Sequence, residues 1–392
     1  MAFQVSPGVL VQERDLTRII PAVSTAIGAF AGSFNKGPLD EIVSISSEQE
    51  LVDTFGKPDS TNFEYFFSAA NFLQYSNSLR VVRATQTNAV NASTSGTGVL
   101  IKNTDDWTNN YASGGQAGNA TFVAREAGTD GNNLQVSTCP NAAAYEEEGA
   151  TTVNDASTAV GDTVVVTASG AALNVGDIIS FSTTAATNDY DDGEQYRVTN
   201  IATNDVTIVQ HPRGTGGLKR ALTDGSNIRR RWKYYDAVDG APGTSTYVSE
   251  RNGANDEIHV VVVDEDGGIS GVPGTILETF SKLSKASDAK DPQGNDNYYP
   301  NVIYTKSQYI YWTKHHASGS NWGNAASGTT FTAVNDPTLE TMSGGSNGSA
   351  VTTGQIKTAY DKFADSETVD ISLIISGPCD STHIENMISI AE

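Results

Sequence analysis

The first residues of the chain alternate between apolar and polar positions around a Pro-Gly break. Phe3 and Val5 precede the break, and Val9 and Val11 follow it. Successive side chains of a β-strand point to opposite faces, so this spacing is typical of an extended segment. Nothing long enough lies nearby to give these apolar residues a core of their own. The pattern therefore predicts that residues 1–22 form an extended N-terminal arm.

A small α/β domain is predicted over residues 23–90. Its strand signals are Thr25–Phe34 and Leu79–Ala84. Between them, Ser47 and Thr61 each precede a glutamate by three positions, which is the pattern of a capping box at the start of a helix. The second helix carries several aromatic residues on one face, so we expect an aromatic core.

Two segments of different character follow. Residues 91–120 are rich in Asn, Thr, Ser and Gly, and they are predicted to be a linker or loops. Residues 139–235 instead show short strand signals separated by turn residues. Four of these signals are Thr163–Thr167, Asp177–Phe181, Gln195–Val198 and Val206–Val209. We expect an inserted, surface-exposed all-β domain, built as a barrel or a sandwich.

An α/β layer core domain is predicted from residues 121–138 and 236–392. Ile258–Val263 is a continuous apolar run, as expected for a strand that is buried on both faces. The pattern predicts a helix over Thr275–Lys285 and a further buried strand over Val369–Ile375.

The fold class is therefore α+β and multidomain. Residues 340–364, which include a helix opened by Thr352 and Gln355, are expected to complete the small domain. A last helix pattern starts at Asp380 and reaches Glu392 without a terminating signal. This indicates a chain that is cut short within a helix, with a natural helical C-terminus as the alternative.

Composition and charge exclude several classes of function. The 24 basic and 46 acidic residues give a net charge of −22, which would repel nucleic acid and anionic membranes. No apolar run approaches the ~18 residues of a membrane span, and the N-terminus lacks the features of a signal peptide. The two cysteines, Cys139 and Cys379, are far apart, so we expect free thiols and neither a disulfide scaffold nor a cysteine zinc site.

The sequence offers no convincing set of residues for catalysis, cofactor binding or metal binding. The acidic run Asp264–Gly268 lacks the glycine and glutamate spacing of a calcium loop, so a tight turn after a buried strand is expected. His315 and His316 are adjacent and would diverge on either a helix or a strand. No histidine lies within a recognisable nucleophile motif. We therefore expect a protein that is not an enzyme, with no cofactor and no metal.

The basic cluster Arg229–Lys233 is the one stretch that could suggest nucleic acid. Because the rest of the chain is strongly acidic, we expect these side chains to neutralise acidic neighbours, either within the chain or across a subunit contact.

Several motifs, read in order, resemble the tail sheath proteins of contractile-tailed bacteriophages. They include the sequences SPGV in the arm, FGKP before a helix, AANFL followed by LRVVRA, GTDGNNL, the strand and turn of Asp256–Gly268, the SGG loop at Ser343, and Thr368–Ser376. The resemblance runs from the arm to the last residue and is weakest across 86–119 and 139–235.

This resemblance implies a structural subunit that forms stacked hexameric rings around the tail tube and contracts to drive the tube through the host envelope. It implies that the arm adds a strand to a neighbouring subunit through Phe3, Val5, Val9 and Val11. The implied partners are further copies of the chain, the tail tube protein, and the baseplate and tail terminator proteins, without direct nucleic-acid contact or membrane insertion. The implied location is the virion, after assembly in the host cytoplasm, and a tube-contacting C-terminal domain is expected after Glu392.

Three alternatives remain open from the sequence. The first is the sheath of a related contractile injection system, of the bacteriocin or secretion type. The second is a glycan-binding or depolymerase tail protein that uses the all-β insert. The third, a cytosolic hydrolase, would need a convergent site that the sequence does not provide.

Overall fold

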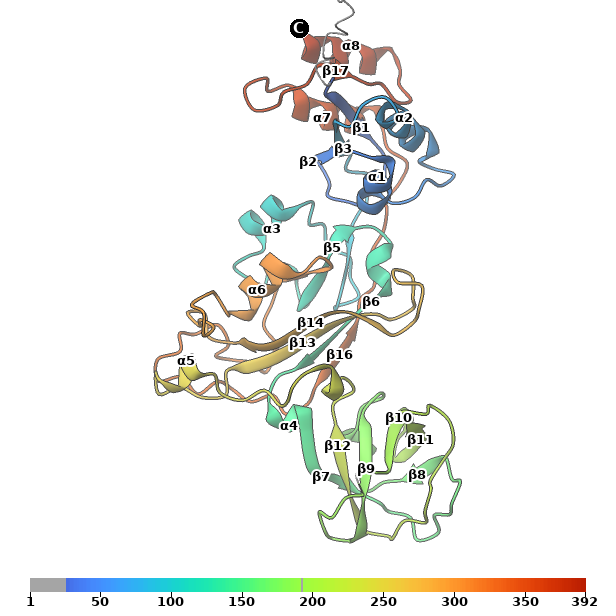
Figure 1. Cartoon of the computed structure of the whole chain (residues 1–392), viewed down its shortest axis with the longest axis vertical. Coiled ribbons are helices and arrows are strands. Elements are labelled where there is room, and N and C mark those ends of the chain that lie inside the picture. The colour runs from blue at the N-terminus through green and yellow to red at the C-terminus, as the bar shows by residue number, and fades with distance from the viewer. Residues whose placement is uncertain (1–25, 192) are drawn as a thin grey trace, which may run out of the picture. The chain divides into compact units, whose positions relative to one another are not determined.

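The computed structural model describes residues 26–191 and 193–392, and these form two compact units. The first unit contains residues 26–85 and 350–392, and the second contains Gln86–Ser349. Both units mix helices with β-sheet (Figure 1). The expectation of an α+β protein is confirmed at this level. Residues 350–392 belong to the first unit, so the small domain is completed by this segment and not by the predicted 340–364, and residues 365–392 are not part of the predicted core domain.

The first unit is a four-stranded sheet with helices on both faces. Its strands are β1 (Gly28–Gly32), β2 (Ile42–Ile45), β3 (Leu79–Arg83) and β17 (Leu373–Ile374). Its helices are α1 (Glu48–Phe55), α2 (Phe63–Leu73), α7 (Thr353–Tyr360), the 3₁₀ turn η4 (Asp361–Phe363) and α8 (Ser381–Ala391). The strand order is β17-β1-β3-β2, with β1 parallel to β17 and to β3, and β2 antiparallel to β3.

Alternation along β1 explains the two helical layers of this unit. Phe30 points into an aromatic core formed with α1 and α2, as the sequence predicted. Ala29 and Ala31 point to the opposite face, where α7 and α8 pack. Since strand side chains alternate between faces, one strand can serve both cores, with small residues where α7 lies close.

The capping predictions for this unit are partly confirmed. Ser47 accepts the N–H of Glu50 at the start of α1, and Thr352 and Gln355 form a complete capping box at α7. The predicted cap at Thr61 is wrong, because α2 begins one residue later, after Asn62. The Thr61 hydroxyl donates to Asp59 instead. The predicted buried strand over Val369–Ile375 is reduced to the two residues of β17.

The second unit contains three sheets. Its strands are β4 (Asn91–Ser93), β5 (Phe122–Ala127), β6 (Leu134–Cys139), β7 (Glu146–Thr152), β8 (Val164–Val166), β9 (Ile178–Ala185), β10 (Gln195–Ala202), β11 (Asp205–His211), β12 (Ser226–Arg231), β13 (Glu257–Asp264), β14 (Thr275–Ser284), β15 (Ile310–Trp312) and β16 (Thr338–Thr341). Its helices are α3 (Thr104–Asn110), α4 (Ala142–Tyr145), α5 (Thr246–Ser249), α6 (Tyr299–Lys306) and the 3₁₀ turns η1 (Asp130–Asn133), η2 (Gly170–Ala172) and η3 (Tyr235–Ala237).

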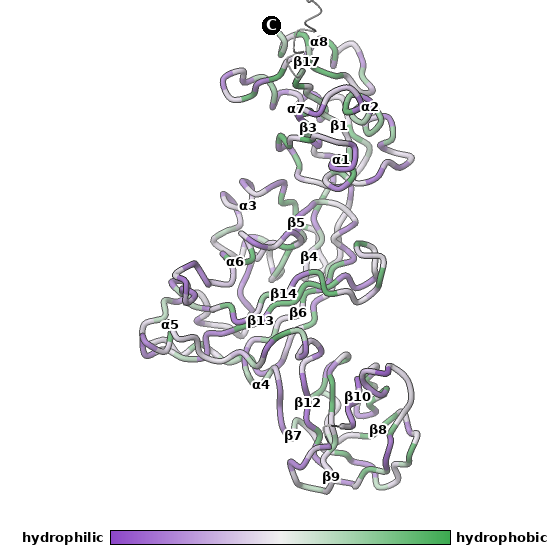
Figure 2. Tube along the Cα trace, in the orientation of Figure 1, coloured by the Kyte–Doolittle hydropathy of each residue, from purple (hydrophilic) through white to green (hydrophobic). Residues whose placement is uncertain are grey.

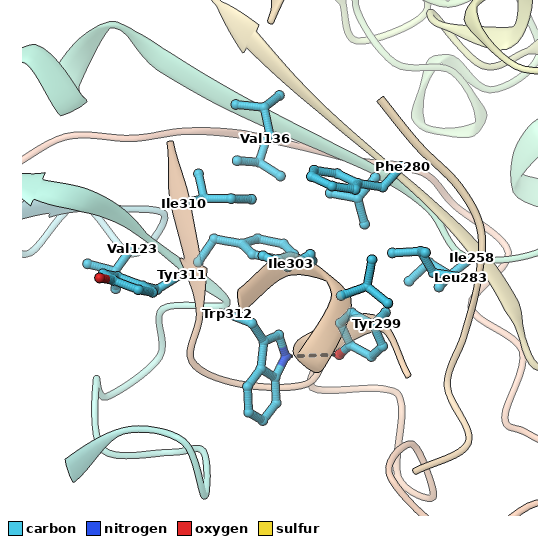
Figure 3. Close-up of a cluster of buried hydrophobic side chains, with 14 of the residues drawn as sticks. Val123, Val136, Ile258, Phe280, Leu283, Tyr299, Ile303, Ile310, Tyr311 and Trp312 are labelled. Carbon is cyan, nitrogen blue, oxygen red and sulfur yellow. Dashed lines mark hydrogen bonds between the residues drawn. The ribbon is translucent and has the colours of Figure 1, made fainter. Parts of the chain in front are cut away.

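The central strand of this unit is β13, in the sheet β14-β13-β6-β16. Its even-numbered apolar residues, such as Val260 and Val262, face the large core shown in Figure 3. Val261 and Val263 face a second cluster that contains Trp232. Both faces of β13 are therefore covered, which is why its sequence is continuously apolar, as Figure 2 shows along the chain.

The predicted helix over Thr275–Lys285 is wrong, because these residues form β14, which pairs antiparallel with β13. Register shifts along this pair let Phe280 and Leu283 face the core although their spacing of three is helical. Because a β-bulge breaks strict alternation, the sequence pattern of a bulged strand imitates that of a helix.

The all-β insert is a single six-stranded antiparallel sheet in the order β7-β12-β9-β10-β11-β8. The four predicted strand signals correspond to β8, β9, β10 and β11. The sheet packs on one apolar core, and an isolated bridge links Val153 and Thr167, the residues that follow β7 and β8. This arrangement replaces the expected barrel or sandwich.

Residues 91–120 are not a linker. They contain β4 and the helix α3, and Ile101 and Trp107 are buried in the large core. Few apolar residues are present, but several of them, including Ile101 and Trp107, are buried, so a low apolar content did not mean an unfolded segment.

Candidate assembly surfaces

The arm residues expected to pair with a neighbouring subunit, Phe3, Val5, Val9 and Val11, lie outside the described residues. The described residues nevertheless show where the arm joins the first unit. The Ser76 hydroxyl donates to the carbonyl of Ala26 at 2.9 Å, and the Gly28 N–H donates to the carbonyl of Ser78. The chain therefore enters β1 beside the C-terminal end of α2.

The first unit has two sheet edges, β17 and β2. The N–H groups of Leu373 and Ile375 donate to the carbonyls of Ile27 and Ala29 on β1. Strand backbone groups alternate in direction, so those of the intervening Ile374 point away from the sheet. An edge of this kind can accept a strand from another chain.

Two helices of this unit expose apolar side chains. On α2, Phe63 and Phe67 are 47% and 50% exposed and lie four residues apart, and Tyr75, just beyond the helix, is 91% exposed. We call these three residues the α2 surface. On α8, Ile384 and Ile388 are also four residues apart and half exposed. Side chains at i and i+4 share a helix face, so each pair forms a contiguous apolar stripe.

Other sheet edges carry features that discourage strand addition. In the insert, the edge strand β7 begins with three glutamates, Glu146–Glu148. In the central sheet, the edge strand β14 has two register shifts, and Lys282 has a positive φ of 52°. Charge and bulges are the usual protection of sheet edges. The edges at β7 and β14 are therefore poor acceptors for an added strand.

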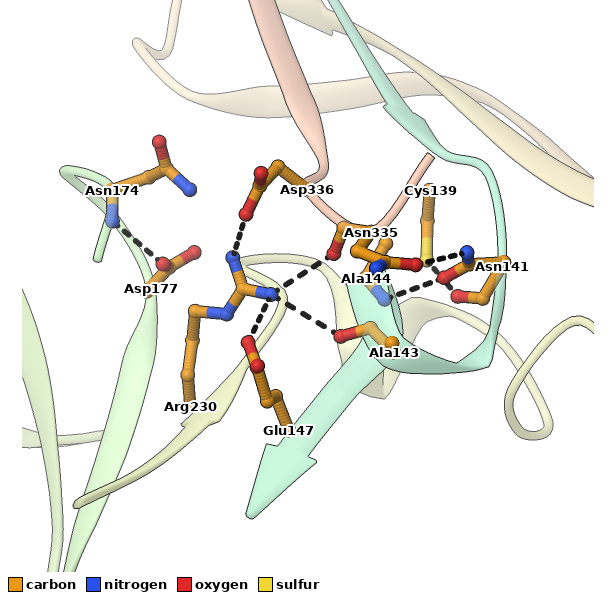
Figure 4. A network of polar contacts seen from close by, with 10 residues as sticks. All are labelled: Cys139, Asn141, Ala143, Ala144, Glu147, Asn174, Asp177, Arg230, Asn335 and Asp336. Atoms are coloured by element: carbon orange, nitrogen blue, oxygen red, sulfur yellow. Dashed lines mark hydrogen bonds and ion pairs between the residues drawn. The ribbon is translucent and has the colours of Figure 1, made fainter. Parts of the chain in front are cut away.

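A polar network joins the insert to the core of the second unit (Figure 4). The fully buried Arg230 of β12 donates to Glu147 of β7 and to Asp336, each at 3.0 Å. Its Nη2 atom also donates to the carbonyls of Ala143 and Asn335. Three separate segments therefore meet at one guanidinium.

The neighbouring arginines of β12 also pair within the chain. Arg231 lies 2.7 Å from Glu146, and Arg229 lies 3.8 Å from the same carboxylate. The expectation that this basic cluster neutralises acidic residues is confirmed. The partners lie on the adjacent strand β7, which runs antiparallel to β12.

Asp177 lies buried beside this network (Figure 4). One of its carboxylate oxygens accepts the Asn174 N–H at 2.7 Å. Burial raises the pKa of Asp177 to about 6, and the hydrogen bond and the nearby Arg230 only partly offset it. The ionised carboxylate is therefore a destabilising feature at neutral pH.

Replacing Asp177 with asparagine is expected to stabilise the second unit by roughly 1–3 kcal/mol at pH 7. Asparagine keeps an acceptor for Asn174 but carries no charge. Because folding raises the pKa of this carboxyl, the wild-type protein loses folding stability as the pH rises from about 4 to about 6. The stability advantage of the asparagine variant should therefore grow over this pH range. Urea titrations of both proteins at pH 4.5 and pH 7 test this, and an advantage that is equal at both pH values would contradict it.

His315 is held between two tyrosines in the large core. Its Nδ1 atom lies 2.6 Å from the Tyr299 hydroxyl, and its Nε2 atom lies 3.2 Å from the Tyr298 hydroxyl. Burial lowers the pKa of His315 to about 4. The imidazole is therefore neutral in the folded protein at physiological pH.

Stability is expected to fall as the pH drops from about 6.5 to 4, because the unfolded chain protonates His315 and the folded chain does not. After allowance for partial exposure, the expected loss is about 1–2 kcal/mol. The variant His315→Phe cannot take up this proton. The difference in unfolding free energy between wild type and variant should therefore change across this pH window, and a constant difference would refute the assignment.

The other candidates for chemistry have structural roles. Asp264 ends β13, and one carboxylate oxygen accepts the N–H groups of Ile269 and Ser270, which makes the expected tight turn. In residues 26–191 and 193–392, no group of three or more His, Cys, Asp or Glu side chains is placed to hold a metal ion. None of the helices in these residues has the length and apolarity needed to cross a bilayer. Cys139 is a buried free thiol and Cys379 an exposed one.

Comparison with known proteins relates the chain to phage tails. Residues 25–84, which include β1, α1, α2 and β3, match the family described as the tail sheath protein Gp18 domain III N-terminal region. The tail sheath protein of Enterobacteria phage T4 is 26% identical over 419 aligned residues, covering 97% of this chain and 58% of the T4 protein. This chain is similar to the phage tail sheath proteins. The resemblance seen in the sequence motifs is confirmed.

A second phage protein and one solved structure also match. The tail sheath protein of Vibrio phage KVP40 is 40% identical over 78 residues, covering 20% of this chain and 12% of the KVP40 protein. The sheath tail protein of Desulfitobacterium hafniense is 10% identical over 98% of this chain and 49% of its own, with a TM-score of 0.30. The chain thus spans little more than half the length of the T4 relative.

Sequence reasoning missed the surfaces of α2 and α8 as sites. The aromatic residues of α2 were assigned to the core, and Phe66 does lie there. Phe63 and Phe67 lie on the outer face of the same helix. Five aromatic residues within ten positions exceed what one face of a helix can hold, and that excess was the available signal.

Proposed function

We propose that the protein is a structural subunit of a contractile phage tail sheath, which assembles as stacked hexameric rings around the tail tube. The observation that supports this best is the similarity to the T4 tail sheath protein across 97% of the chain. We prefer a phage sheath to the sheath of a bacteriocin or secretion system, because both curated relatives come from phages. On this proposal the protein is a virion component without enzymatic activity, cofactor or metal.

Subunits would be linked by strand exchange. The arm, residues 1–22, would add a strand to a sheet of a neighbouring subunit, with Phe3, Val5, Val9 and Val11 filling pockets. The position of β17 supports this, because among the described strands it lies at the edge of its sheet, beside the exposed side chain of Leu373. Main-chain hydrogen bonds would give affinity, and the alternate side chains would set the register.

Contraction would then be the relaxation of a metastable assembly. Compact units of this kind move as nearly rigid bodies, while exchanged strands keep neighbours attached as other interfaces repack. The work would come from many modest contacts along the tail and not from nucleotide hydrolysis. The tail tube, baseplate and tail terminator proteins would be the partners, and assembly would take place in the host cytoplasm. The net charge of −22 would keep free subunits apart and soluble.

Replacing Phe3, Val5, Val9 and Val11 together with serine is expected to lower the yield of polymer by at least about tenfold. Losing one buried Val or Phe side chain from the contact already costs about 1.5–3 kcal/mol of binding free energy. A cost of 1.4 kcal/mol lowers the association constant about tenfold. Sedimentation and negative-stain electron microscopy of the protein expressed from its gene, with the tube protein added, measure the yield. Hollow tubes or rings are expected for the unsubstituted protein.

A matched control replaces the polar arm residues Gln4 and Gln12 with serine, which keeps the apolar positions intact. This control should polymerise like the unsubstituted protein. If the serine variant polymerises equally well, strand exchange through these residues is wrong. If the unsubstituted protein never forms tubes or rings, with or without the tube protein, the sheath assignment itself fails, and binding of glycans by the insert becomes the next test.

A further inference from the structure

We propose that a small cavity inside the second unit is a binding site for one water molecule, which hydrogen-bonds to the Thr338 hydroxyl and the Glu340 carboxylate. The walls of the cavity come from the central sheet and from the sheet β15-β5-β4. Three observations support the site: the size of the cavity, the polar side chains on one of its walls, and a buried hydroxyl without a partner. The site does not depend on the proposed assembly into a sheath.

The cavity has the size of a single small molecule. Its volume is about 20 Å³, and a buried space of roughly 10–15 Å³ is enough to hold one water molecule. Phe122 of β5, Ile258 of β13 and Tyr299 of α6 form part of its apolar wall, and all three are buried. A water molecule therefore fits, whereas a sugar or an amino acid is too large.

One wall of the cavity is polar. Thr338 and Glu340 lie two residues apart on β16, so their side chains point to the same face of the central sheet. Thr138 lies opposite Thr338 in the register of β6 and β16, and it also lines the cavity. Val136, the register partner of Glu340, belongs to the large apolar core. Three polar side chains are thus grouped on a sheet face that is otherwise part of this core.

The Thr338 hydroxyl is buried, and within the part of the chain that the structure describes it has no hydrogen-bond partner. Burying a hydroxyl in this way is costly, because the group gives up its hydrogen bonds to solvent. Buried polar atoms that find no partner in the chain are commonly bonded to an ordered water. Because the Thr338 side chain lines the cavity, a water molecule there supplies the missing partner.

Glu340 is the second partner of the water. One of its carboxylate oxygens accepts the Thr121 hydroxyl at 2.7 Å, and burial raises the pKa of this carboxyl. Lys314 also lines the cavity, but its ammonium donates to the Gly118 carbonyl and to the Asn119 side chain. A water molecule can donate to the carboxylate without bringing a further charge into the core.

The bound water connects the two sheets of this unit. Thr121, which directly precedes β5, already links that strand to Glu340 of β16. The water extends this link to Thr338 and, through the Thr138 hydroxyl, to β6. Buried waters usually make about three hydrogen bonds, and these three side chains provide that number.

High-resolution crystallography of the protein tests the site directly. We expect a water peak at about 2.5–3.0 Å from both the Thr338 hydroxyl oxygen and a carboxylate oxygen of Glu340. The variant Thr338→Val keeps the shape of the side chain but removes the hydroxyl, so the peak should be lost. The control Thr341→Val lies on the opposite face of the same strand and should retain the peak. A dry cavity in the unsubstituted protein, or an unchanged peak in Thr338→Val, would overturn the proposal.

A bound cation has to be distinguished from water. In crystals soaked with a rubidium salt, an anomalous peak inside this cavity would show a monovalent cation and overturn the proposal. The variant Glu340→Gln removes the negative charge and keeps a hydrogen-bonding side chain. We expect the water to remain in this variant, and loss of the peak would count against water, because a cation depends on the charge.

Magnetic relaxation dispersion of the water signal gives a readout in solution that needs no crystal. Its amplitude rises with the number of buried waters that exchange slowly with solvent. Thr338→Val should contain one such water fewer per chain than the unsubstituted protein and Thr341→Val. Equal numbers in all three proteins would refute the site. None of these measurements depends on polymerisation, so failure here is distinguishable from failure of the sheath assignment.

Discussion

Replacing Trp107 with alanine is expected to lower the unfolding free energy of the second unit by about 3–5 kcal/mol, the usual cost of removing a buried tryptophan. Trp107 belongs to α3, in the segment whose composition indicated a linker. Its ring is almost fully buried and stacks on Tyr304 at 4.5 Å and on Tyr311 at 5.7 Å between ring centroids. The Arg125 guanidinium lies over the ring of Tyr311.

The effect should be large because Trp107 ties together distant parts of the sequence. Its Nε1–H donates to the carbonyl of Trp312, 205 residues away, at 2.8 Å. Alanine would leave that carbonyl without its donor, open a cavity beside Tyr311, and lose the stacking energy of about 0.5–1.5 kcal/mol per aromatic pair. The whole of α3 should then lose its main attachment.

Urea unfolding followed by tryptophan fluorescence measures this loss. The four tryptophans are Trp107, Trp232, Trp312 and Trp322, and all lie between residues 86 and 349. The signal therefore reports on the second unit alone, also in the variant. The matched control is Asn109→Ala, an exposed position on the same helix, which should change stability by less than about 0.5 kcal/mol. If Trp107→Ala lowered the unfolding free energy by less than about 1 kcal/mol, the packing of α3 would contribute little to the stability of the second unit.

The case of α3 shows what the sequence could and could not predict. Strands with strong apolar patterns were predicted correctly, such as Ile258–Val263 within β13, because burial on both faces leaves a direct trace in the sequence. The segment around Trp107 contains too few apolar residues for a local signal. Its stability comes from partners that are about 200 residues away, which no local window can include.

The error at β14 has a different origin. Its apolar residues have helical spacing because bulges shift the register against β13, and only the paired strand reveals this. The candidate site was predicted in part. The sequence indicated the arm and its alternating residues, which remain a prediction. It did not indicate the α2 surface, because exposure of Phe63 and Phe67 depends on which face of α2 packs on the sheet.

Replacing Arg230 with methionine is expected to destabilise the second unit by about 2–3 kcal/mol and to loosen the insert first. Breaking a buried ion pair typically costs 3–5 kcal/mol. The cost should be lower here because Glu147 and Asp336 are 42% and 76% exposed and regain water when the guanidinium is lost. The carbonyls of Ala143 and Asn335 still lose a charged donor, which methionine cannot replace.

Local loosening separates this prediction from a general loss of stability. Arg230 connects β12 and β7 of the insert to the segment at Asp336, so amide exchange should accelerate in residues 141–152 before it does so in β13. The control Arg213→Met removes an exposed arginine of the same domain and should leave both stability and exchange unchanged. Equal acceleration in β7 and β13 would mean that Arg230 supports the core as a whole. In that case Arg230 would not serve to fix the insert. If Arg230 attached the insert alone, its loss would leave β13 protected from exchange.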